Sequence, residues 1–326
     1  MLKDFTKASD YAHIFIIAML MLIYYFTGDI NFNVPEHYPN ASPVGNWLLE
    51  KLQSIPQFIK PINLLLIAAI AWYTNRAAVM ADIIPRRSYI AASLITGLML
   101  FSPPAVWFTG TLVVILLLVF ALVNLMNLFG RDYPYLHVIN ASMAISIASL
   151  ILPQIIMFVL FLWFAFFTFS VNSWREWMIS FVGFVLPYLY TAFAWFWGDN
   201  LGNLLHDYND YFHGIGFNYH IPGTFIIVTL SLILIIFIAA SLHFTGEASD
   251  KVISTRKRMW ITFQFAFVGL LMIITGGEFI FLLIPVLYLP MAMMVSYSIH
   301  NSRNSRLYDI LFLLLIISII FNRLGY

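Results

Sequence analysis

The sequence contains no cysteine, and only 10% of its 326 residues are charged. The absence of cysteine excludes disulfide bonds, thiolate metal ligands and cysteine nucleophiles. A soluble chain carries roughly 25% charged residues, so this chain has too few polar groups to cover a globule in water. Its net charge of +1 argues against nucleic acid as a partner. Most of its surface is therefore expected to face membrane lipids.

Motifs that bind nucleotides or catalyse hydrolysis are also missing. The sequence has no Gly-rich phosphate loop, no G-x-S-x-G and no H-E-x-x-H. The apolar runs lack charged residues in their middle, which counts against an ion-coupled pump. Three classes stay open: a membrane-embedded transferase, a non-catalytic component of an envelope assembly, and a transporter or flippase for a lipid-like substrate.

Apolar residues make up 62% of the chain, and its mean hydropathy is +0.88. A helix needs about 20 apolar residues to cross a bilayer. The stretch 88–129 has 42 residues and must cross twice, with Pro103-Pro104 at the reversal. We therefore predict an all-α polytopic protein, a single transmembrane domain over residues 1–326. The expected crossings are 12–27, 61–75, two in 88–129, two in 138–171, 178–197, 222–244, 259–275, 279–298 and 307–322.

The positions of Lys and Arg give the orientation and test the number of crossings. With two crossings in 138–171, reversing at Pro153-Gln154, one side holds thirteen of the sixteen basic residues. The other side holds only Lys51, Lys60 and Arg323. With one crossing in that stretch, seven basic residues oppose nine. Inside loops retain Lys and Arg, so we predict eleven helices with the N-terminus inside and the C-terminus outside.

The first apolar run follows a basic start and resembles a signal peptide in composition. It continues to Phe26 and is not followed by a small-x-small cleavage site. We predict an uncleaved first helix.

Two of the predicted outside loops are long, 28–60 and 198–221. In the first, apolar residues such as Trp47 and Leu52 recur at helical spacing within Gly45–Ser54. This pattern predicts a short amphipathic helix at the membrane interface.

The second loop has no Lys or Arg and carries three histidines seven residues apart. The candidate ligands for a divalent metal ion are His206, Asp210 and His213, with His220 and Asp207 nearby. A seven-residue helical step separates two ligands by about 10.5 Å, so a single ion requires a bend, which Gly214 and Gly216 are suited to make. The alternative is an interfacial loop whose histidines meet lipid headgroups.

Three acidic residues at predicted outer helix ends are candidates for catalysis. Asp29 follows the first crossing, Asp199 follows the seventh, and Glu278 lies between two apolar runs. A carboxylate at such a place can act as a base toward an acceptor substrate. Asp29 is alternatively a helix-end residue in a wet loop, and Glu278 a charge that complements a helix dipole.

Other polar residues have structural interpretations. Lys251 and Arg256–Arg258 form a basic cluster that is expected mainly to stop translocation, with attraction of anionic lipid as the second interpretation. The polar side chains in or near crossings are expected to link helices by hydrogen bonds. They include Asn63, Asn124, Gln154, His243 and Gln264.

The middle of the chain carries three motifs that resemble a known group of proteins. They are Asn140–Pro153, a helix rich in small residues, then Asn172–Trp177 with its Arg-Glu-Trp, and Val182–Tyr188 with its Gly and Pro-Tyr. These motifs look like an uncharacterised family of polytopic inner-membrane proteins of Bacteroidota. The resemblance implies a bacterial inner-membrane protein, with the outside loops in the periplasm, and brings no assigned reaction.

A second resemblance is architectural. Eleven crossings, an acidic residue after the first and an interfacial helix in the first outside loop are similar to the GT-C class of membrane glycosyltransferases. That class implies an outward carboxylate as base, matched by Asp29, and a sugar donor carried on polyprenyl phosphate. Lys51 and Lys60 are the outward candidates for the donor phosphate. The chain departs from the class in having no paired acidic motif after Asp29.

Overall fold

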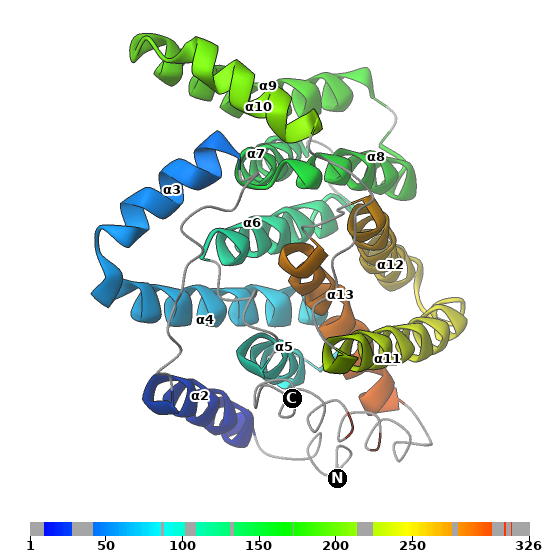
Figure 1. Ribbon diagram of the computed structural model, residues 1–326. Helices are drawn as coiled ribbons and strands as arrows, with labels where there is room; N and C mark the ends of the chain where they lie inside the picture. The colour runs from blue at the N-terminus through cyan, green and yellow to red at the C-terminus, as the bar shows by residue number, and fades with distance from the viewer. Residues whose placement is uncertain are drawn as a thin grey trace.

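The computed structural model describes residues 10–27, 42–85, 88–101, 109–130, 134–171, 173–213, 224–275 and 280–301, with Ile310 and Leu314. Within these ranges the chain is helical and contains no strand, which confirms the predicted all-α class (Figure 1). The helices are α2 (Asp10–Thr27), α3 (Pro43–Gln53), α4 (Pro56–Met80), α5 (Ile90–Phe101), α6 (Thr109–Met126), α7 (Tyr135–Ile151), the 3-10 helix η2 (Pro153–Met157), α8 (Phe158–Phe169), α9 (Trp174–Trp197), α10 (Leu201–His213), α11 (Thr224–Ala248), α12 (Ile253–Thr275) and α13 (Ile280–Asn301).

Six helices in the described part of the chain are long and apolar enough to cross a membrane. They are α4, α6, α9, α11, α12 and α13. Helices α5, α7 and α8 have 12, 17 and 12 residues, fewer than the roughly 20 that a perpendicular crossing needs. The expected crossing 307–322 lies outside the described residues except for Ile310 and Leu314. A membrane protein is therefore supported, whereas eleven crossings and the orientation of the termini stay predictions.

The stretch predicted to reverse at Pro153-Gln154 does turn back on itself. Near the start of α7, His137 Nδ1 lies 3.0 Å from Asn124 Oδ1 of α6. At the end of α8, the ring of Phe169 lies 6.2 Å from that of Phe129, just after α6. The start of α7 and the end of α8 therefore lie together, and η2 forms the tip of a helical hairpin. We call residues Leu150–Met157 the hairpin tip.

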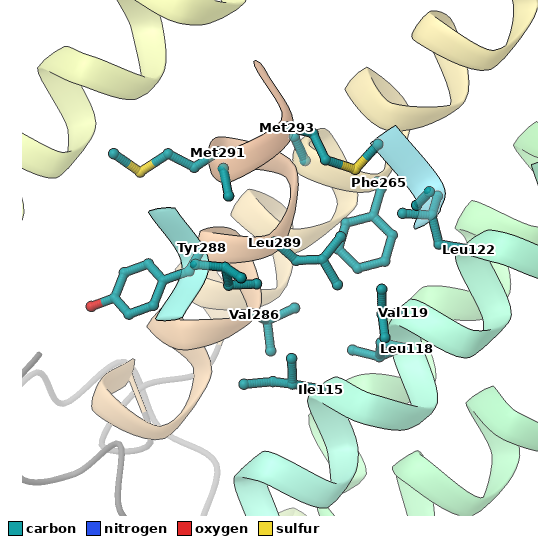
Figure 2. Packing of buried hydrophobic residues seen from close by; sticks show 14 of the residues in the cluster. Ile115, Leu118, Val119, Leu122, Phe265, Val286, Tyr288, Leu289, Met291 and Met293 are labelled. Carbon is teal, nitrogen blue, oxygen red and sulfur yellow. The ribbon is translucent and has the colours of Figure 1, made fainter. Parts of the chain in front are cut away.

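Helix α13 lies at the centre of the bundle, with contacts to α5, α6, α11 and α12. Figure 2 shows Val286 and Leu289 of α13 packed between Ile115 of α6 and Phe265 of α12, all fully buried. Lipid tails are as apolar as these side chains, so close van der Waals packing, rather than removal from water, holds such a core together. The described core is one continuous cluster of apolar side chains.

Helix α9 is held mainly against α7, through small residues. A Cβ at Gly183 would collide with the Ser142 hydroxyl and lie 3.3 Å from the Ile139 carbonyl oxygen. One turn further along α7, Ser146 Oγ donates a 2.6 Å hydrogen bond to the carbonyl oxygen of Phe184. Small residues let two helix backbones approach closely, as in other membrane bundles.

Substitution of Gly183 tests this close approach. We expect Gly183→Leu to lower the free energy of unfolding by about 1–3 kcal/mol, because the added side chain has no space against α7. Thermal unfolding in detergent measures the effect. Gly97→Leu on α5 is the matched control, since a Cβ there meets nothing within 4 Å. Equal stability of the two variants would contradict the assignment.

Candidate functional site

One end of the bundle gathers the segments that carry the predicted site residues. Ser146 of α7 bonds to Phe184 of α9, and Ser149 Oγ lies 2.8 Å from the Tyr188 hydroxyl, so the two helices run parallel. Helix α7 ends at Ile151, shortly after this contact, whereas α9 continues to Trp197 beyond it. Thr275 Oγ1 at the end of α12 donates to Met157 Sδ at the hairpin tip, 3.4 Å away. We call this the outer end, because the predicted topology places it outside. The other end, where α4, α6 and α8 finish and α12 begins, is the inner end.

Ser42 fixes α3 to the outer end. As N-cap of α3, its Oγ accepts a 3.0 Å hydrogen bond from the Gly45 amide. The same hydroxyl lies 2.8 Å and 2.6 Å from the carbonyl oxygens of Leu150 and Ile151. These carbonyls lie in the last turn of α7, where the helix itself supplies no donors, and Pro153 has no N–H to offer. One buried serine thus caps two helices.

Tyr208 attaches α10 to the same carbonyl. Its hydroxyl donates to the Leu150 carbonyl oxygen at 3.3 Å, while Leu204 one turn earlier is buried. Burial raises the pKa of the Tyr208 phenol, and the neighbouring Tyr188 phenol adds to the rise. The group therefore stays a hydrogen-bond donor at all physiological pH values. Helices α3 and α10, which also touch each other, form what we call the outer cap.

The predicted metal ligands lie along α10, which is a continuous helix through His213. Positions 206, 210 and 213 have the spacing i, i+4, i+7 and lie on the side of the helix opposite Leu204 and Tyr208. Without a bend between them, His206 and His213 stay about 10.5 Å apart along the axis. His206 is exposed, and the side chains of Asp210 and His213 lie outside the described residues, as do Gly214, Gly216 and His220.

Within the residues that the structure describes, no group of three or more His, Asp or Glu side chains is arranged to hold a metal ion. A divalent metal at α10 therefore stays a prediction, in which His206 with Asp210 is the pair at ligand spacing.

Of the predicted catalytic acids, the structure describes Asp199. It is exposed, follows the end of α9 and has a left-handed backbone conformation with φ of 54°. Asp29 and Glu278 lie outside the described residues. Helices α9 and α12 finish at the same end of the bundle. Asp199 follows α9, and Glu278 comes three residues after the end of α12.

The two predicted phosphate-binding lysines belong to the first outside loop. Lys51 is exposed in the last turn of α3, and Lys60 is half-buried near the start of α4. Helix α3 covers most of the segment Gly45–Ser54, so the predicted amphipathic helix is confirmed as a helix. Because α3 is anchored by Ser42, Lys51 belongs to the outer cap.

A polar cluster at the inner end was not predicted as a site. His243 Nε2 of α11 lies 3.3 Å from Glu247 Oε1, and the Tyr297 hydroxyl of α13 donates to Glu247 Oε2 at 2.6 Å. Lys251 Nζ lies 5.5 Å from the centre of the Tyr297 ring. Sequence reasoning gave His243 only a general role in linking helices and did not consider Glu247. The i, i+4 spacing of a histidine and a glutamate at a helix end was the available signal.

The basic cluster has a structural role in this fold. Arg258 donates a 2.6 Å hydrogen bond to the Met80 carbonyl oxygen at the end of α4. Lys257 donates to Ser170 Oγ, just past the end of α8, at 3.3 Å. Cations are stabilised at helix C-termini, where carbonyl oxygens point outward. These contacts favour joining of helix ends over recruitment of anionic lipid.

Comparison of the chain with protein-family models, with curated proteins and with solved structures gives no match in any of the three. The resemblances to a Bacteroidota membrane family and to the GT-C class therefore stay predictions.

The Ser42 cap is open to a direct test. Ser42→Ala removes the hydroxyl that serves both α3 and α7, and we expect a loss of about 1–2 kcal/mol in the free energy of unfolding. Hydrogen exchange should rise within α3 before it rises in the core. Ser54→Ala is the control, because its exposed hydroxyl bonds only to Lys51 in its own turn. Similar exchange in both variants would refute the anchoring role.

The inner cluster predicts a second stability effect. Tyr297→Phe leaves Glu247 without its phenol donor, and a hydrogen bond to a charged group is worth about 1.5–3 kcal/mol. We expect a lower unfolding temperature and weaker protection of α11. The control is Tyr190→Phe, since Tyr190 is exposed on α9. An unchanged unfolding temperature for Tyr297→Phe would show that the contact contributes nothing.

Proposed function

We propose that the protein is a membrane-embedded transferase of the GT-C type that acts on a lipid-linked sugar at the outer end. The supporting observation is the outer cap, in which helices from both long loops dock on the last carbonyls of α7. Asp199 follows α9 at the same end, and α12 finishes there shortly before Glu278. This supports the proposal, because Asp29 and Asp199 belong to the two loops whose helices form the cap.

In the proposed reaction, Asp29 takes the proton of an acceptor hydroxyl. The acceptor oxygen then forms a bond to the anomeric carbon of the sugar, and the bond from that carbon to the polyprenyl phosphate oxygen breaks. The leaving phosphate is an anion, which a nearby cation stabilises. Lys51 and Lys60 supply the positive charge in this proposal, while Asp199 and Glu278 orient the acceptor. A bacterial inner-membrane location belongs to the same proposal.

A non-catalytic envelope component is the second candidate. Helix α9 favours it, because large apolar side chains are exposed along its whole length. They include Met178, Phe181, Leu189, Phe193, Phe196 and Trp197. Such a surface suits either lipid or the transmembrane helix of a protein partner. The transporter comes third, because the described core is filled with apolar side chains around α13.

Removal of the proposed base tests the transferase. Asp29→Asn keeps the size of the side chain and removes the base, so we expect transfer to fall by about 10²–10⁴-fold. The measurement is transfer of labelled sugar from polyprenyl phosphate to an acceptor in reconstituted vesicles. Asp250→Asn is the control, an exposed carboxylate after α11 at the inner end. Full transfer by Asp29→Asn would reject the proposed base.

A further inference from the structure

The amide of Gln154 is a buried polar group without a partner in the described residues. Gln154 lies in η2 at the hairpin tip and is 6% exposed. Neither Oε1 nor Nε2 forms a hydrogen bond to the described part of the chain. A buried polar group left unpaired costs about 1–3 kcal/mol, and the next two residues, Ile155 and Ile156, show that apolar side chains suit this turn. Such costs are found where a function needs the group.

Gln154 lies close in the chain to the two carbonyl groups that hold the outer cap. It comes four residues after Leu150 and three after Ile151, whose carbonyl oxygens hold Ser42 and Tyr208. Thr111 of α6 is a second fully buried side chain without a partner in the described residues. Helices α6 and α7 are antiparallel and touch at Asn124 and His137. Thr111 lies thirteen residues before Asn124, and Leu150 lies thirteen residues after His137, so the two are at the same level of the bundle. A layer of polar side chains therefore lies at the level of the cap.

The chemistry of this layer selects a neutral ligand. A glutamine amide both donates and accepts hydrogen bonds and carries no charge, which matches the hydroxyl groups of a sugar. A phosphate requires a cation, and a buried charge must be paired. The one charged side chain buried in the described residues is Glu176, at the opposite end of α9, where it accepts a hydrogen bond from Ser173.

We infer that Gln154 is a substrate-binding residue whose amide hydrogen-bonds a sugar hydroxyl of the lipid-linked substrate, and this inference rests on the proposed function for the identity of the ligand. The sugar reaches Gln154 when α10 lifts from the hairpin tip, while Ser42 keeps α3 in place. The Tyr208 hydroxyl lies 3.3 Å from the Leu150 carbonyl oxygen, longer than the usual range of about 2.5–3.0 Å for an O–H···O bond. That bond is weak and is readily exchanged for contacts to a ligand.

The test combines stability with binding in the full chain, reconstituted in phosphatidylethanolamine–phosphatidylglycerol vesicles. The probes are farnesyl phosphate glucose and farnesyl phosphate alone. For Gln154→Leu without a probe we expect an unfolding temperature equal to or above that of the unchanged chain, because an unpaired amide has been removed. We expect its affinity for the glucosyl probe to fall by about tenfold or more, as for a lost hydrogen bond. Affinity for farnesyl phosphate should not change.

Ser298→Ala is the matched control, because Ser298 of α13 also has a fully buried oxygen without a partner in the described residues but lies near the inner end. It should keep full affinity for the glucosyl probe. A lower unfolding temperature for Gln154→Leu would overturn the inference, since the amide would then serve the fold. Unchanged affinity for the glucosyl probe would overturn it as well.

Failure of the inference is distinguishable from failure of the proposed function. Asp29→Asn should lose transfer but retain affinity for the glucosyl probe, whereas Gln154→Leu should lose affinity. If Asp29→Asn transfers sugar normally while Gln154→Leu loses probe affinity, the binding role stands and the assigned base is wrong. If Asp29→Asn loses transfer and Gln154→Leu binds normally, the base stands and the inferred sugar contact is wrong.

Discussion

Hydrogen bonding of backbone carbonyls at the helix ends is the constraint on which the rest of this structure depends. Inside a bilayer every carbonyl must find a donor within the protein, and a helix leaves its last four without one. Helix α7 ends at a proline, so the following turn cannot supply the missing amide. Ser42 and Tyr208 supply hydroxyls instead, from segments 108 and 58 residues away from Leu150. The unpaired carbonyls of α7 thus fix the positions of α3 and α10.

The inner end meets the same need with different chemistry. There Arg258 donates to the Met80 carbonyl oxygen at the end of α4, and Lys257 donates to the Ser170 hydroxyl just past the end of α8. Cations and hydroxyls are both donors, but only the inner end uses charge for this purpose in the described contacts. The asymmetry matches the sequence, in which the predicted inside carries most of the Lys and Arg. The same residues that orient a chain in the membrane therefore also join its helices.

The apolar runs and prolines made the helical class, the reversal at Pro153 and the helix around Trp47 predictable, because each depends on local sequence. The contacts of Ser42 and Tyr208 were not predictable, and Gln154, which was expected to link helices by hydrogen bonds, has an unpaired amide within the described residues. A serine that caps its own helix has the same local signature whether or not it also bonds to a distant carbonyl. Glu247 could have been found from its local spacing to His243, but its contact with Tyr297, 50 residues away, could not. Local patterns specify elements, and pairing between distant elements decides which polar groups meet.

The central position of α13 has a consequence for how the protein is made. This helix contacts α5, α6, α11 and α12, yet it is the last of the helices with described bounds to leave the ribosome. Until it arrives, its neighbours border a space that only lipid or an insertion factor can fill. Pro285 and Pro290 make α13 itself a poor helix in isolation. A chain stopped before residue 280 would thus keep the packing among α4, α6 and α7 but lack the helix against which α5, α11 and α12 pack.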